Sequence, residues 1–245
     1  YLTKGKCQVC TKVCKSNAIN FDMKEEMREF SVGAVVLAPG FDEYDATRKY
    51  PFGYGRYDNV ITSIQFERIL SASGPFEGHV KRPSDQTDPK RVAFIQCVGS
   101  RDIQYGSGYC SGVCCMYAVK ESIIAKEHAP ATDITIFYMD MRAYGKGFDA
   151  YYEEARDKHG IRFVPSNVSG IKEDPETKNL QVKYVSEDGR VLEEEFDMVV
   201  LSVGLEPSKT SKELAQALDI DLNHYSFCST KGFSPLNTSK PGIFV

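Results

Sequence analysis

Uninterrupted apolar runs alternate with helix-like segments through residues 90–206. Each run is short, rich in β-branched residues and bounded by turn residues, which is typical of strands buried on both faces of a parallel sheet. The segments between the runs have the length and apolar spacing of helices. The predicted strands are at residues 91–96, 133–139, 161–164 and 198–203, and the predicted helices are at residues 113–128 and 148–159.

Three further segments alternate polar and apolar residues, at 168–173, 180–185 and 191–196. This period of two predicts a small antiparallel meander with one buried face. A strand–helix–strand–helix–strand order, then a meander, then a final buried strand, is the plan of a Rossmann-like nucleotide-binding unit. The pattern therefore predicts an α/β fold.

The first ninety residues are less regular. The run Val32-Gly-Ala-Val-Val-Leu-Ala38, ended by Pro39-Gly40, suits a fully buried parallel strand, although a short buried helix fits the same pattern. A helix is predicted over residues 63–71, capped by Thr62 or Ser63. Residues 74–90 contain prolines, glycines and charges and are expected to be a surface connection.

Composition narrows the class of protein. The chain has 245 residues, 42% hydrophobic and 26% charged, with a net charge of −4, which gives no electrostatic footprint for nucleic acid. No apolar run approaches the roughly 20 residues that span a bilayer, and the first residues lack the apolar core of a signal peptide. Eight cysteines without such a signal indicate metal or redox chemistry in the cytoplasm.

Four of these cysteines, with the spacing C-x12-C-x3-C-C, follow the first strand of the α/β unit and end at the start of its first helix. An ordinary dinucleotide fold places its glycine-rich phosphate loop there. The positive end of the helix would favour thiolates and a negatively charged cluster. We predict an iron–sulfur centre on Cys97, Cys110, Cys114 and Cys115. Inert buried cysteines, a structural zinc and a redox disulfide between Cys114 and Cys115 remain alternatives.

A second group is Cys7, Cys10 and Cys14, with the spacing C-x2-C-x3-C. Ferredoxin-type runs use C-x2-C-x2-C-x3-C, so this segment matches their later part. Lys4 stands where the regular spacing would put the remaining cysteine. The fourth ligand is expected upstream, elsewhere or not at all, and zinc is an alternative metal for this spacing.

These motifs resemble the family of the iron–sulfur and flavin subunit of CoB–CoM heterodisulfide reductase. The resemblance rests on the stretch Ala93-Phe-Ile-Gln-Cys-Val-Gly-Ser-Arg-Asp102 and on Tyr109-Cys-Ser-Gly-Val-Cys-Cys-Met-Tyr-Ala118, and it extends over nearly the whole chain. It implies a thioredoxin-reductase-like fold in which an FAD-type domain is interrupted by a nicotinamide-domain-like insertion. The implied division is a partial iron–sulfur segment at 1–20, FAD-type domain and linker at 21–89, the insertion with its cysteine motif at 90–206, and truncated FAD-type domain at 207–245.

The resemblance also implies roles. Gly40 would lie at the flavin-binding strand end, although Pro39 replaces the threonine of that family. The four clustered cysteines would hold a [4Fe–4S] relay and Cys7, Cys10 and Cys14 part of another. The chain begins inside a cysteine motif and stops in a strand, so we expect a fragment. It lacks the family's N-terminal glycine motif for FAD, so FAD is expected in the intact parent and weakly or not at all here.

The implied activity of the parent is flavin-based electron bifurcation. Its implied partners are other subunits of the complex and ferredoxin, or a hydrogenase or formate dehydrogenase subunit that supplies electrons. No residue is predicted to be a catalyst of proton transfer. Two other functions stay open from the sequence: a zinc-stabilised docking scaffold, and a pyridine-nucleotide-disulfide oxidoreductase-like domain that uses nicotinamide.

Overall fold

The computed structural model describes residues 7–245, and its contacts divide the chain into two compact units. The larger unit comprises Pro39–Cys228, and the smaller one joins the residues up to Ala38 with Ser229–Val245. Within the described part of the chain, no helix is long and apolar enough to cross a membrane.

The larger unit is built on a five-stranded sheet in the order β3-β10-β4-β5-β6, in which every neighbouring pair is parallel. Val200 of β10 is level with Ile61 of β3 and with Phe94 of β4. All six residues of β10 are buried, as expected for a central parallel strand. The strands are β3 (Val60–Thr62), β4 (Arg91–Val98), β5 (Asp133–Tyr138), β6 (Arg162–Pro165) and β10 (Met198–Val203).

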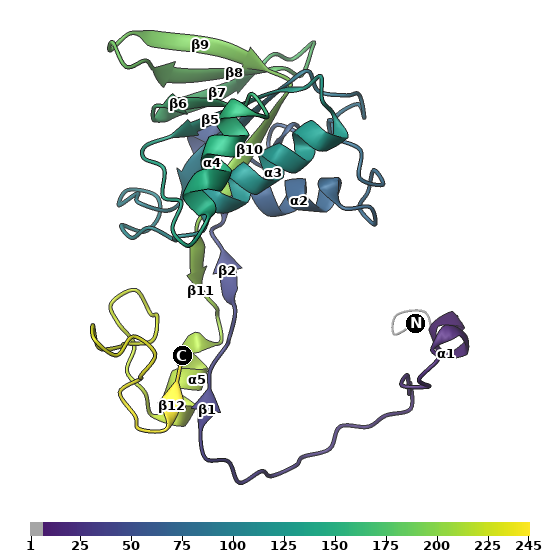
Figure 1. Cartoon of the computed structure of the whole chain (residues 1–245), viewed down its shortest axis with the longest axis vertical. Coiled ribbons are helices and arrows are strands. Elements are labelled where there is room, and N and C mark those ends of the chain that lie inside the picture. Colours follow the sequence, from purple (N-terminus) through teal and green to yellow (C-terminus); the bar gives the residue numbers. More distant parts are fainter. Residues whose placement is uncertain (1–6) are drawn as a thin grey trace. The chain divides into compact units, whose positions relative to one another are not determined.

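Three helices cover one face of this sheet: α2 (Ser63–Leu70), α3 (Cys114–His128) and α4 (Phe148–Asp157) (Figure 1). Phe66 of α2 packs edge-to-face on Phe94 of β4, with ring centroids 5.4 Å apart. Thr62 caps α2 and exchanges hydrogen bonds with Gln65 in a capping box, so the predicted helix start is confirmed.

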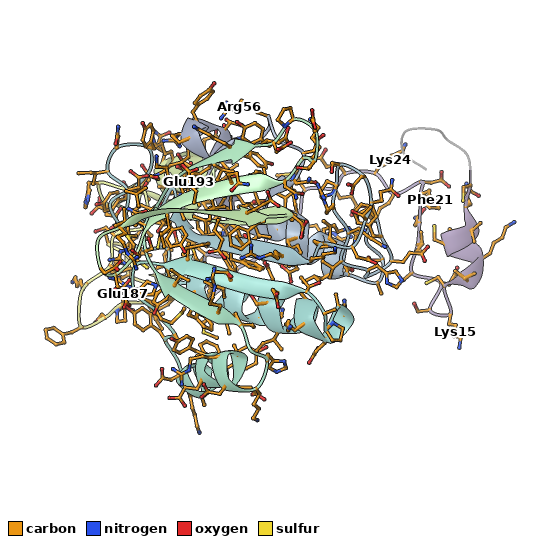
Figure 2. The ribbon with its side chains drawn as sticks, turned by 90° about the horizontal axis from the view of Figure 1, so that it is seen from above. Lys15, Phe21, Lys24, Arg56, Glu187 and Glu193 are labelled. Atoms are coloured by element: carbon orange, nitrogen blue, oxygen red, sulfur yellow. The ribbon has the colours of Figure 1, made fainter. Side chains whose placement is uncertain are left out.

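The antiparallel meander β7 (Val168–Glu173), β8 (Leu180–Val185) and β9 (Val191–Phe196) covers the opposite face. Phe137 of β5 packs on Tyr184 of β8 with ring centroids 4.8 Å apart. Figure 2 shows side chains filling the space around the sheet strands, with Glu193 on β9 and Glu187 in the turn before it. The predicted α/β fold with a parallel sheet and a meander is confirmed.

The contacts divide the chain differently from the predicted boundaries at residues 89 and 206. β3, which lies in the predicted FAD-type segment, hydrogen-bonds along β10 and so belongs to the central sheet. A two-stranded antiparallel pair joins β2 (Phe41–Glu43) to β11 (Leu205–Pro207). These pairings tie residues on both sides of the predicted boundaries into one unit, which also holds the 3-10 helices η1 (Ala46–Arg48) and η2 (Tyr50–Phe52) and the helix α5 (Ser211–Leu218).

The smaller unit contains α1 (Val9–Val13) and a parallel pair of two-residue strands, β1 (Val35–Val36) and β12 (Ile243–Phe244). The prediction of a fully buried strand at residues 32–38 is wrong for this chain, because Val32 and Val36 are 63% and 75% exposed. Parallel strands are buried when neighbouring strands and helices cover them, and in residues 7–245 β1 has β12 as its one strand partner.

Candidate metal centre

Cys97 lies near the C-terminal end of β4 and has a left-handed backbone, with φ of 60°. Two residues later Gly99 also has a positive φ, 78°, and a Cβ there would lie 2.0 Å from the ring of Tyr44. Only glycine fits that position. The strand therefore turns sharply away from the sheet at Cys97, and this turn directs the chain into the long loop that the sequence predicted.

That loop is closed by its own backbone. The amide of Arg101 donates to the carbonyl of Tyr109 at 2.8 Å, and the amide of Ser107 donates to the carbonyl of Gly99 at 3.0 Å. The Tyr109 hydroxyl donates to the carbonyl of Leu205 at 2.7 Å, which ties the loop to β11. These bonds hold the segment that carries Cys110 beside the start of α3.

Cys114 and Cys115 are the first two residues of α3 and both are buried. No side chain caps this helix start, so its positive end stays available to a negative group. The Cys114 thiol donates to the carbonyl of Val203 at 3.5 Å, and the Cys115 thiol lies 3.9 Å from the carbonyl of Asp140. The amide of Gly112 donates to the Cys110 sulfur at 3.4 Å.

The four thiols influence one another electrostatically. Burial raises the pKa of Cys97 to about 11, with the charge of Cys115 adding to the effect. Burial likewise raises the pKa of Cys114 to about 12, and negative charge on Cys97, Cys115 or Cys110 raises it further. Both thiols are therefore protonated near neutral pH, so metal binding there must release protons.

A cluster of charged side chains borders the thiols. Asp140, after β5, forms ion pairs with Arg101 of the loop and with Arg142, the latter at 3.2 Å. The positive charge of Arg101 lowers the pKa of Cys97, and the backbone amide and the charge of Arg142 lower that of Cys115, both against the larger effect of burial. The arginines therefore favour the thiolate form that a metal requires.

The donor set fits an iron–sulfur cluster in its chemistry, because four cysteine sulfurs are its usual ligands. The sheet and loop bring Cys97, Cys110, Cys114 and Cys115 into one neighbourhood, where each affects the ionisation of another. Among residues 7–245, however, no three cysteine, histidine or acidic side chains form a group that could hold a metal ion. The thiols are thus neighbours without meeting at one point.

Cys7, Cys10 and Cys14 belong to the smaller unit. Cys10 lies on α1, Cys7 has a positive φ of 76°, and Cys14 follows the helix. A hydrogen bond with the Ser16 hydroxyl and one from the amide of Ala18 lower the pKa of Cys14, which favours its thiolate. Residues 1–6, including Lys4, lie outside the described residues, and a metal site on these three cysteines stays a prediction.

Gly40 is exposed, with φ of 73° and nothing within 4 Å of the place where a Cβ would lie. Its backbone therefore requires glycine and leaves open space on that side. A flavin contact at Gly40 remains a prediction.

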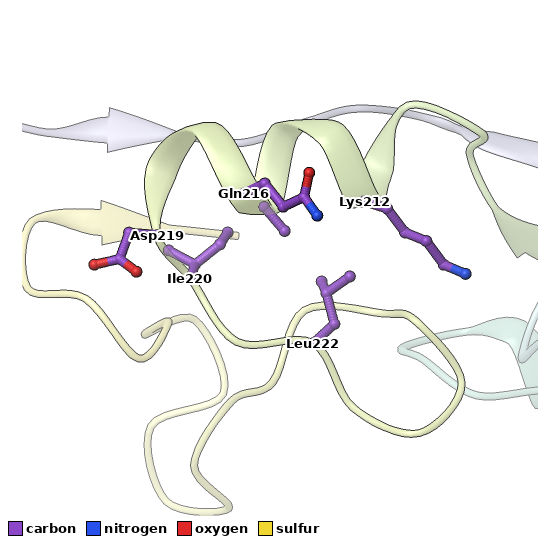
Figure 3. Close-up of a pocket in the computed structure, with 6 residues that line it drawn as sticks. Lys212, Gln216, Asp219, Ile220 and Leu222 are labelled. Carbon is purple, nitrogen blue, oxygen red and sulfur yellow. The ribbon is translucent and has the colours of Figure 1, made fainter.

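Two hollows lie near α3 and α5. A cavity of about 670 Å³ lies between the starts of α3 and α4 and is lined mainly by apolar and aromatic groups, including Met116, Tyr117 and Phe148, and by Lys120 and Lys146. A hollow of about 460 Å³ follows α5, between Lys212 and Gln216 of the helix and Leu222 beyond it (Figure 3). The first adjoins the cysteine-bearing helix start, whereas the cysteines do not line the second.

Sequence reasoning missed two residues of α3. The Tyr117 hydroxyl donates to the carbonyl of Val203, the same carbonyl that Cys114 approaches. Glu121 is only 3% exposed, and its Oε2 has no hydrogen-bond partner in the described structure. A signal for Glu121 existed, because it shares the inner stripe of the helix with Cys114, Ala118 and Ala125.

Comparisons with known proteins agree with this architecture. The sequence model of the pyridine nucleotide-disulphide oxidoreductase family matches residues 3–245. The CoB–CoM heterodisulfide reductase iron–sulfur subunit of Methanocaldococcus jannaschii is 44% identical over 98% of this chain, and a subunit of the same name from Methanopyrus kandleri is 48% identical over 94%. The similarity to this heterodisulfide reductase subunit, which the cysteine motifs indicated, is confirmed.

The chain spans 37% and 36% of the length of these two relatives. Among solved structures, the FAD-bound cadaverine monooxygenase DfoA of Erwinia amylovora is 8% identical, and the match covers 86% of this chain and 53% of DfoA with a TM-score of 0.47. The matched family model covers the central sheet, the meander and both cysteine groups. The chain therefore belongs to the pyridine nucleotide-disulphide oxidoreductase family.

Proposed function

We propose that the chain is an electron-transfer part of a flavin- and iron–sulfur-containing oxidoreductase of the heterodisulfide reductase type. Its working group would be a [4Fe–4S] cluster on Cys97, Cys110, Cys114 and Cys115. The observation that carries this proposal is the gathering of four thiols at the strand-to-helix turn where related folds hold a diphosphate. Relatives named as iron–sulfur subunits support the choice of metal.

A bound cluster would supply one-electron exchange. The chain's own residues would bind it, exclude water and balance its charge. Burial of Cys114 and Cys115 keeps that side dry, while the uncapped start of α3 and the guanidinium groups of Arg101 and Arg142 offer positive charge. Positive charge and low exposure both tune the potential of such a centre.

The wider assignment follows from the relatives. We propose that the whole protein binds FAD, divides electron pairs at the flavin and works in the cytoplasm with other subunits of a heterodisulfide reductase complex. Ferredoxin, or a hydrogenase or formate dehydrogenase subunit, would exchange electrons with it. Cys7, Cys10 and Cys14 would contribute to a second cluster whose fourth ligand comes from elsewhere.

Two other functions predict different contents. A zinc-stabilised scaffold would bind zinc and carry no electrons. A nicotinamide-dependent reductase agrees with the family model, but Cys97-Val-Gly-Ser-Arg-Asp102 departs from the glycine fingerprint that lets a diphosphate approach the backbone. The gathered thiols favour the electron-transfer function over both.

Metal analysis of anaerobically prepared protein distinguishes these functions. We expect iron and acid-labile sulfide in a ratio of about one to one, with about four of each at the Cys97–Cys115 site, and a reducible cluster signal in EPR spectra. Zinc without sulfide would support the scaffold and contradict the proposal. A colourless protein that binds NADH or NADPH tightly would instead support the nicotinamide-dependent reductase.

We also expect this chain alone to retain little or no FAD. Its sequence lacks the glycine-rich strand-to-helix turn on which the flavin diphosphate rests in this family. Gel filtration after incubation with excess FAD, followed by the flavin absorbance of the protein peak, checks the expectation. A peak with one FAD per chain would contradict it.

A further inference from the structure

Tyr117 connects the helix core to the cysteine site. It lies on α3, and its hydroxyl donates a hydrogen bond of 2.5 Å to the carbonyl of Val203 at the end of β10. Its ring lines the cavity between the starts of α3 and α4. The hydroxyl end is thus directed toward the sheet, while part of the ring faces the cavity.

The same carbonyl holds Cys114. The Cys114 thiol donates to the carbonyl of Val203 at 3.5 Å, and a hydrogen bond with the Tyr117 hydroxyl lowers the pKa of Cys114 against the effect of burial. Hydroxyl and thiol therefore share one acceptor and lie within hydrogen-bonding reach of each other. Burial raises the pKa of Tyr117 well above its ordinary value, so the hydroxyl keeps its proton and stays a donor.

Loss of the thiol proton changes this arrangement. Once Cys114 binds metal as a thiolate, its proton leaves for solvent and the sulfur can no longer donate to Val203. A charged acceptor forms a hydrogen bond roughly twice as strong as a neutral carbonyl does. Glu121, the acidic group one turn further along α3, does not compete, because burial raises its pKa to about 9 and keeps it neutral.

We propose that Tyr117 is a positioning residue for the cluster: its hydroxyl donates to the Cys114 thiolate and raises the reduction potential of the centre. The proposal rests on the proposed function. Reduction adds negative charge to the cluster and its sulfurs, so a donor to a ligand sulfur stabilises the reduced state more than the oxidised one. Tyr117 would thereby set how readily the centre accepts an electron.

The test compares two tyrosines of the same cavity wall. In reconstituted protein, Tyr117→Phe removes the hydroxyl and is expected to lower the midpoint potential by an amount equal to a tenfold change in the reduction equilibrium, about 59 mV for one electron. Tyr151→Phe is the control, because Tyr151 lines the cavity from α4 and its charged neighbours are Glu127 and Glu154. EPR-monitored redox titration measures both.

Incorporation of 3-fluorotyrosine at position 117 gives a second readout if the phenylalanine variant does not load. It preserves the shape of the ring and makes the hydroxyl a stronger donor, so the potential should rise. A wild-type cluster signal with the same potential in the variants at position 117 would overturn this role alone. Absence of any four-iron signal from the wild type would overturn the proposed function and this role together.

Discussion

Replacement of Cys114 with serine is expected to abolish the cluster at the Cys97–Cys115 site while leaving the fold intact. Cys114 is the most deeply buried of the four thiols, so its sulfur has no alternative neighbour in solvent. A serine hydroxyl is a far poorer iron ligand than a thiolate, because it keeps its proton near neutral pH. We expect the iron content to fall by about four atoms per chain and the corresponding EPR signal to disappear.

Cys228→Ser is the matched control. Cys228 lies in the loop after α5, where its backbone pairs with Leu222, and does not take part in the thiol cluster. Its replacement should leave iron, sulfide and spectrum unchanged. A Cys114→Ser protein that keeps the wild-type iron content and signal would show that the ligand assignment is wrong, and unchanged far-ultraviolet circular dichroism would exclude unfolding as the cause of a loss.

Replacement of Glu121 with glutamine is expected to stabilise the protein increasingly as pH rises. Burial, with a smaller contribution from the charge of Glu67, raises the pKa of Glu121 from 4.5 to about 9. Between these values the folded protein holds a proton that the unfolded chain releases, so the free energy of unfolding falls as pH rises. Glutamine resembles the neutral carboxyl and removes this slope.

Each pH unit in that window corresponds to about 1.4 kcal/mol. The variant and the wild type should therefore be similarly stable near about pH 4.5 and differ by up to about 4 kcal/mol near about pH 8. Urea titrations at several pH values measure the difference. Glu127→Gln, at an exposed position of the same helix, should leave the slope unchanged, and a parallel slope in the Glu121 variant would contradict the assignment.

The order of elements in the larger unit was predictable because burial on both faces leaves a local record. The runs at residues 91–96, 133–139 and 198–203 are apolar throughout, and each became a strand of the parallel sheet. The meander followed from strict alternation. The helix at residues 63–71 followed from the Thr62 cap, whose hydrogen bond is a contact between near neighbours in the sequence.

Other features depend on distant partners and left no local record. The exposed run around Val36 has the composition of a buried strand, but burial depends on which strands and helices lie beside it. β3 is only three residues long, and its pairing with β10 joins segments more than a hundred residues apart. Composition specifies neither pairing, because strand partners are chosen by the whole fold.

The sequence by itself determined the α/β class, the two cysteine groups and the similarity to the iron–sulfur subunit of heterodisulfide reductase, because residue types and spacings are local properties. Only the tertiary structure decided that Tyr117 and Cys114 share the carbonyl of Val203, that Arg101 and Arg142 meet at Asp140, and that Glu121 is buried. Each of these relations joins separate strands, loops and helices, and hydrogen bonding, ion pairing and desolvation act through space.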